Sequence, residues 1–187
     1  DYERDIPKIK AITECAIQNW KAKGEINLME ELYKLIVEIR GEVFFQKSFG
    51  CLDQDFDKDN LAHTVHKILQ APTFMLSGNP DNLVKQFHEI VKEAIESSNE
   101  AGSLGNICKT KFENGEFSSE EAIQNASMFL LAQAPTMILF WNLLRTAQNK
   151  SSKALANDDV KLLQHLKEEL RIHPAVPSIF SRIAQRT

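Results

Sequence analysis

Apolar residues recur every three or four positions along most of the chain, which is the spacing of one face of an α-helix. No stretch shows the sustained alternation of apolar and polar residues that marks a half-buried β-strand. The few glycines and prolines fall between the apolar stretches, where they separate helices. The pattern therefore predicts an all-α, multi-helix bundle in which residues 1–187 form a single helical domain.

Start and stop signals place the helices along the chain. The first is expected to follow Asp5, with Pro7 in its opening turn, and to stop at Gly24. Asn27 is expected to cap a second helix that runs to about residue 43. Further helices are expected over 61–69 and from 79 to about 102, and residues 103–115 are expected to be irregular.

The C-terminal third is organised around the longest apolar segment. Ser118 and Glu121 form a capping box, which predicts a helix that continues to about Leu144. Residues 149–159 read as a polar linker, and a last helix carries leucines at 163, 166 and 170 until Pro174 ends it. The one exception to the all-helical pattern is an extended strand that the sequence allows over 175–184.

Residues 122–144 contain no charged side chain, and a helix of that length, at about 1.5 Å a residue, could span a bilayer. Six polar residues within the segment favour a buried helix of a soluble bundle instead. Pro135 cannot donate a hydrogen bond to the carbonyl of Leu131, so the helix should kink or open there. The opened turn could receive a ligand, or Thr136 could close it by bonding to the backbone.

The 22 Lys and Arg residues against 26 Asp and Glu give a net charge of −4, which argues against a nucleic-acid partner. Cys15, Cys51 and Cys108 form no CxxC pair and are expected to be reduced thiols. Two glycosylation tripeptides, at Asn125 and Asn149, make secretion a minority interpretation. His63 and His66 lie three residues apart, but two histidines at this spacing more often lie on the solvated surface of a helix than bind a metal ion. No metal site is therefore predicted.

Three segments together resemble the cytochrome P-450 superfamily of haem-thiolate monooxygenases. Residues 167–177, Lys-Glu-Glu-Leu-Arg-Ile-His-Pro-Ala-Val-Pro, are similar to its ExxR helix and the turn that follows. Residues 117–136 resemble its long central helix with the oxygen-activation turn, and residues 25–32 resemble the segment that enters an earlier helix. The resemblance implies an orthogonal helical bundle around a long central helix, like the central helical part of that fold.

The resemblance also assigns roles to particular residues. It implies that Thr136 delivers protons to iron-bound dioxygen if haem is present, and that Glu168 and Arg171 form a structural ion pair. Pro135 replaces the family's acid. Gln133 replaces its glycine, as also happens in the branch that contains prostacyclin synthase and cholesterol hydroxylase. Arg182 would match an arginine that binds a haem propionate. The residues expected to line an apolar pocket are Phe129, Leu130, Gln133, Pro135, Met137, Phe140 and Trp141.

The family holds its iron through a cysteine well downstream of the ExxR helix, whereas this sequence ends sixteen residues after Arg171 (187 − 171 = 16). We therefore expect a truncated or degenerate relative, a pseudoenzyme that carries no haem and binds a small lipophilic ligand without catalysis. One alternative is a fragment of an active haem monooxygenase, an oxidoreductase or isomerase acting on a sterol, fatty acid or eicosanoid. Another is a structural or membrane-associated protein that contacts a partner through residues 122–144. The resemblance suggests that the protein is located at the endoplasmic reticulum or in the cytoplasm, and the sequence itself does not choose between these two compartments.

Overall fold

A computed structural model describes residues 2–70, 82–132, 136–137, 139–140 and 158–172. These residues form seven α-helices and one π-helical turn, with no strand among them. The prediction of an all-α, multi-helix bundle is therefore confirmed. Contacts divide the chain into two compact units, Asp1–Ala132 and Gln133–Thr187, and each is described by itself.

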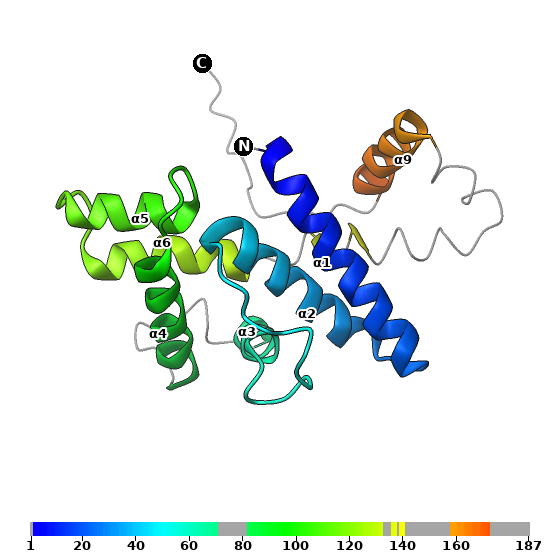
Figure 1. Cartoon of the computed structure of the whole chain (residues 1–187), viewed down its shortest axis with the longest axis horizontal. Coiled ribbons are helices and arrows are strands. Elements are labelled where there is room, and N and C mark those ends of the chain that lie inside the picture. The colour runs from blue at the N-terminus through cyan, green and yellow to red at the C-terminus, as the bar shows by residue number, and fades with distance from the viewer. Residues whose placement is uncertain (1, 71–81, 133–135, 138, 141–157, 173–187) are drawn as a thin grey trace, which may run out of the picture. The chain divides into compact units, whose positions relative to one another are not determined.

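The first two helices of the first unit lie side by side (Figure 1). Helix α1 spans Tyr2–Lys23, and Gly24 then adopts a positive φ of 76° at the turn that leads to α2, Leu28–Arg40. Asn27 is the N-cap of α2, as expected, although its side chain makes no capping hydrogen bond. Directly after α2 the chain forms a π-helical turn, Gly41–Phe45, where the sequence predicted only more α-helix.

Four further helices complete the first unit. Helix α3 is Leu61–Gln70, α4 is Asn82–Ser97, α5 is Leu104–Glu113 and α6 is Ser119–Leu131. The capping box at the start of α6 is confirmed, because Ser118 accepts from the Glu121 amide and the Glu121 carboxylate accepts from the Ser118 amide. Helix α6 contacts α2, α3, α4 and α5, which makes it the centre of this bundle.

The expectation that residues 103–115 are irregular is wrong, because they contain α5. Ser103 caps this helix by accepting from the amide of Asn106 at 3.2 Å. Gly105 weakens the helical signal of the sequence, yet the packing requires it: a Cβ there would lie 2.7 Å from the side chain of Ser98. A close approach between α5 and the end of α4 therefore explains a residue that reads as a helix breaker.

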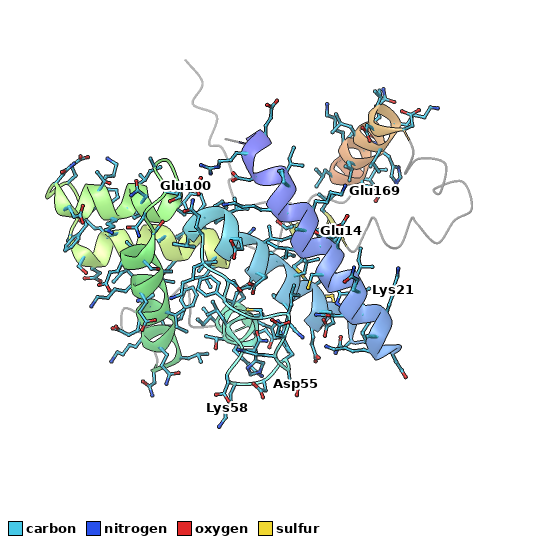
Figure 2. The ribbon with its side chains drawn as sticks, viewed as in Figure 1. Glu14, Lys21, Asp55, Lys58, Glu100 and Glu169 are labelled. Atoms are coloured by element: carbon cyan, nitrogen blue, oxygen red, sulfur yellow. The ribbon has the colours of Figure 1, made fainter. Side chains whose placement is uncertain are left out.

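The core of the first unit is one apolar cluster to which every helix from α2 to α6 contributes. Phe45, Phe87 and Leu130 are among its fully buried members. A smaller cluster around Ala16 and Leu35 joins α1 to α2. Glu100, in the turn between α4 and α5, ties that turn to the first turn of α1 through Arg4 at 2.8 Å (Figure 2).

The second unit contains helix α9, Asp159–Ile172, which is the last helix that the sequence predicts. Leu163 and Leu170 are exposed on it, whereas Leu166 is half-buried and Glu169 is buried. Within the described residues, no helix is both long enough and apolar enough to cross a membrane. The strand expected over 175–184 and most of the 149–159 linker lie outside the described residues.

Candidate functional site

The apolar segment 122–144 is interrupted near its middle, and this interruption is the candidate site. Helix α6 ends at Leu131, and Ala132 has φ −70° and ψ 50°, which is not helical. Residues 136–137 and 139–140 are helical again. The helix therefore ends four residues before Pro135, at the residue whose carbonyl loses its helical donor because proline has no N–H.

Arg40, the last residue of α2, binds the end of α6. Its Nη1 donates to the carbonyl oxygen of Phe129 at 2.6 Å and more weakly to that of Leu130 at 3.4 Å. Its Nη2 donates to the carbonyl oxygen of Ala132 at 2.7 Å. A guanidinium carries several N–H donors in one plane, and those of Arg40 bind the terminal carbonyls of α6. Helix α6 begins 79 residues after Arg40 in the chain (119 − 40 = 79).

The electrostatics of this contact suit a cation. The C-terminus of a helix carries partial negative charge, so a positive side chain is stabilised there. Burial lowers the pKa of Arg40 from its ordinary value, but arginine remains charged in proteins. Each hydrogen bond is therefore charge-assisted and stronger than one between neutral groups.

Apolar side chains surround the same helix end. Met128 is 59% exposed and Phe129 is 48% exposed, although both belong to the last turn of a central helix. The ring of Phe129 packs edge-on against Phe44 of the π-helical turn, with centroids 5.5 Å apart. The site thus combines an apolar patch, which we call the α6-end patch (the exposed Met128 and Phe129 with the half-buried Phe44), with the backbone groups of an interrupted helix.

The other residues expected to line a pocket divide into three groups, and they are described together with Thr136 and Arg182, to which the resemblance gives separate roles. Leu130 is fully buried in the core of the first unit. Met137 is buried, and Thr136 and Phe140 are half-buried, in helical stretches of the second unit. Gln133, Pro135, Trp141 and Arg182 lie outside the described residues. Their part in a ligand pocket stays a prediction.

Glu168 and Arg171 form the ion pair that their spacing on α9 predicts. The contact is bidentate, with Arg171 Nε 2.8 Å from Glu168 Oε2 and Nη2 2.6 Å from Oε1. The hydrogen bonds to Arg171 lower the pKa of the Glu168 carboxyl. Both side chains are largely exposed, 70% for Arg171 and 52% for Glu168, so this is a surface pair.

The cysteines differ in their surroundings, and the two buried ones do not resemble an activated thiolate. Burial, reinforced by the neighbouring Glu38 carboxylate, raises the pKa of the Cys51 thiol to about 12. Burial also raises the pKa of Cys108, whereas Cys15 is exposed on α1. Cys51 and Cys108 are therefore buried, neutral thiols at neutral pH.

His63 and His66 pack against aromatic rings rather than facing a common position where a metal ion could bind. His66 lies edge-on to Tyr33 at a centroid distance of 4.6 Å, and His63 lies edge-on to Phe56 at 5.3 Å. Phe56 comes from the loop that also carries Asp55 and Lys58 (Figure 2). Among the residues that the structure describes, no three His, Cys, Asp or Glu side chains are grouped so as to hold a metal ion.

An open cleft of about 310 Å³ lies elsewhere in the first unit, between α4, α5 and α6. Its apolar lining includes Ile95, Ala122 and Phe112, and Phe112 is 49% exposed. Lys92 and Lys109 lie at this cleft together with Glu96 and Glu113, so its charges balance. It is a second apolar surface with which the α6-end patch can be compared by experiment.

Comparison with known proteins adds no relative. None of the family models, curated proteins or solved structures compared with the chain matches it.

Arg40 is the residue of the candidate site that the sequence did not predict. Its one local signal is a basic residue in the last turn of a helix, which is common, and its partners lie about ninety residues away.

Proposed function

We propose that the chain is a relative of the cytochrome P-450 superfamily that binds a small lipophilic ligand without haem-thiolate catalysis. The observation that carries the proposal is the interruption of the apolar segment at Ala132, with Met128 and Phe129 exposed beside it. Ligand sites of this kind combine apolar side chains with a few polar groups that fix orientation. The α6-end patch and the backbone of the interrupted helix supply both.

The position of the interruption supports the family relationship. In the resemblance, residues 117–136 correspond to the family's central helix, whose oxygen-activation turn is the place where that helix opens. Helix α6 begins at the expected capping box and ends at Leu131, two residues before Gln133 and four before Pro135. The family turn and the helix end therefore coincide in the sequence. The exposed ends of Met128 and Phe129 give a lipophilic ligand apolar surface to cover.

The state of the thiols supports the non-catalytic part of the proposal. A haem-thiolate enzyme needs a deprotonated cysteine as its iron ligand. Cys51 has a pKa of about 12 and lies fully buried in the core, where haem could not reach it without unfolding the first unit. Cys108 is also buried, with a raised pKa. This sequence therefore supplies no ready axial thiolate from its buried cysteines.

A binding assay tests the proposal. The probe is 1-anilinonaphthalene-8-sulfonate, whose fluorescence rises in apolar sites, and palmitate and cholesterol serve as competitors. We expect palmitate or cholesterol to displace the dye from the wild-type chain. Phe129→Glu should weaken binding by about tenfold, which corresponds to about 1.4 kcal/mol, because a charge would replace the exposed ring.

Phe112→Glu is the matched control. Phe112 has almost the same exposure as Phe129, 49% against 48%, but lies at the cleft between α4, α5 and α6. The control should leave binding unchanged. If Phe112→Glu abolished binding and Phe129→Glu did not, the ligand would belong to the cleft and the proposed site would be wrong.

Haem titration tests the non-catalytic part separately. Haem added to the purified chain should give no haem-thiolate absorbance band when it is reduced in the presence of carbon monoxide. The appearance of that band, and its loss in Cys15→Ser, would favour an enzyme over a binding protein. The dye experiment would remain valid in either case.

A further inference from the structure

The carbonyl groups at the end of α6 can be accounted for one by one. In a helix that continued past Leu131, the carbonyls of residues 129, 130, 131 and 132 would accept from the amides of residues 133, 134, 135 and 136. Residue 135 is proline, so the carbonyl of Leu131 has no such donor. Arg40 donates to the other three. Arg40 therefore binds three of the four carbonyl oxygens at this helix end, and the proline removes the helical donor of the fourth.

The geometry of Arg40 also obstructs that next turn. Helix carbonyls point along the axis towards the C-terminus, so a guanidinium that binds the carbonyl of Phe129 lies at the end of the helix. The same guanidinium also binds the carbonyl of Ala132, the first residue beyond the helix. A carbonyl oxygen can accept two hydrogen bonds, but the planar guanidinium occupies the space from which the following turn would donate. Continuation of α6 would therefore require the guanidinium to leave.

Arg40 is held firmly at its own end. It is the last residue of α2, and the π-helical turn that follows begins at Gly41, which is tightly enclosed by Lys47 and Phe49. Phe44 of that turn packs on Phe129, one of the residues whose carbonyl Arg40 binds. The contact between α2 and the end of α6 thus has a polar and an aromatic component side by side.

The same point in the chain separates the two compact units. The first unit ends at Ala132, and the carbonyl of Ala132 is the acceptor for Nη2 of Arg40. We infer that Arg40 is a positioning residue that fixes the place where the chain leaves the first unit, by holding α6 closed at Leu131 independently of Pro135. This inference does not rest on the proposed ligand or on the family relationship.

The test restores the missing donor and removes the arginine, separately and together. Pro135→Ala returns an N–H to residue 135, Arg40→Met removes the donors while keeping an apolar stem, and the double variant does both. Amide hydrogen exchange of residues 133–136, read by NMR, reports whether the helix continues, and circular dichroism reports the total helix content. Urea unfolding checks that each variant is folded.

We expect Pro135→Ala alone to leave the exchange of the amides of residues 133, 134 and 136 unchanged, because Arg40 still covers the helix end. In the double variant the amides of residues 133–136 should exchange at least about tenfold more slowly, with a gain in helix signal. Arg40→Lys combined with Pro135→Ala should fall between the two, because one ammonium cannot bind carbonyls on both sides of the helix end.

Lys109→Met combined with Pro135→Ala is the control for loss of a helix-capping cation. Lys109 Nζ donates to the carbonyl of Glu96 at 3.1 Å near the end of α4, so its removal disturbs a different helix end. The control should behave like Pro135→Ala alone. Slower exchange of residues 133, 134 and 136 in Pro135→Ala alone, or unchanged exchange in a folded double variant, would overturn the inference. If the double variant did not fold, the Pro135→Ala result would decide.

Discussion

Lys34 donates a hydrogen bond to Oε1 of Glu31 at 3.1 Å, and the two side chains are 1% and 10% exposed. They lie three residues apart on α2. Glu31 also accepts from Nε1 of Trp20 at 2.8 Å and from Lys23 at 2.8 Å, both on α1. One buried carboxylate thus joins the first two helices and neutralises a lysine that has almost no access to water.

This arrangement predicts unequal costs for the two members of the pair. Glu31→Leu leaves the Lys34 ammonium buried without its carboxylate and should lower the free energy of unfolding by about 3 kcal/mol, the lower end for a broken buried pair. Lys34→Met should cost about 1 kcal/mol or less, because Glu31 keeps Trp20 and Lys23 and methionine fills the space. Urea unfolding of the two variants measures the difference. Equal costs would mean that Lys34 finds water or another anion when Glu31 is removed.

Stability should also decrease as the pH falls below the ordinary histidine pKa of about 6.5. Burial, followed by the charges of Lys67 and His63, lowers the pKa of His66 below its ordinary 6.5, and Glu30 opposes the shift only weakly. A histidine whose folded pKa is depressed is protonated first in the unfolded chain. Its contribution to stability is therefore complete above pH 6.5 and is lost as the pH falls from there towards the folded pKa.

The packing of His66 gives this prediction a matched variant. His66 lies edge-on to Tyr33 and beside Phe56, and its Nδ1 is buried without a hydrogen-bond partner. His66→Phe preserves the ring packing and removes the titration, so its stability should depend less on pH in this range. His88, whose pKa burial also lowers, should account for a residual slope. An unchanged slope in His66→Phe would show that His66 is not the responsible group.

The sequence predicted those features that depend on neighbouring residues. The capping box of Ser118 and Glu121 and the stop at Gly24 both rest on contacts within four residues, and both are observed. Features that depend on distant packing were missed or misplaced. Gly105 reads as a helix breaker until Ser98 is seen beside it, and the π-helical turn after Arg40 has no signature in the spacing of apolar residues.

The candidate site shows the same division. Pro135 correctly indicated an interruption, and the helix ends at Leu131, the residue whose carbonyl that proline cannot serve. The partner that covers this end, Arg40, comes from a helix far earlier in the chain. Hydrophobic periodicity fixes which face of a helix is buried, but it does not say which distant side chain lies at the helix end.

The exposure of the ExxR-like pair leads to a third prediction. Glu168 and Arg171 are bidentate, but both side chains are mostly in water, where ion pairs contribute little to stability. Arg171→Ala should therefore leave the melting temperature of the chain unchanged. A clear fall would show that the pair is covered in solution by a part of the protein or by a partner. Lys161→Ala, which removes the exposed pair that Lys161 makes with Asp158 at the start of the same helix, is the control.

The last prediction compares the glycines that flank α2, Gly24 before the helix and Gly41 directly after it. Each position favours glycine for a different reason. A Cβ at Gly41 would lie 2.5 Å from the carbonyl oxygen of Lys47 and 2.6 Å from the ring of Phe49. The backbone of Gly41 is helical, with φ −55° and ψ −54°, so without that obstruction alanine would stabilise the turn. We expect Gly41→Ala to destabilise the chain by about 2–3 kcal/mol, because the obstructing atoms include backbone.

Gly24→Ala is the comparison. Nothing lies within 4 Å of a Cβ at Gly24, but its φ of +76° is unfavourable for alanine and should cost about 1 kcal/mol. Urea unfolding midpoints of the two variants, at unchanged dependence on urea concentration, give the order directly. If Gly41→Ala proved neutral or stabilising, the contact of Gly41 with Lys47 and Phe49 would be looser than described. Gly41 would then not hold Arg40 rigidly at the end of α6.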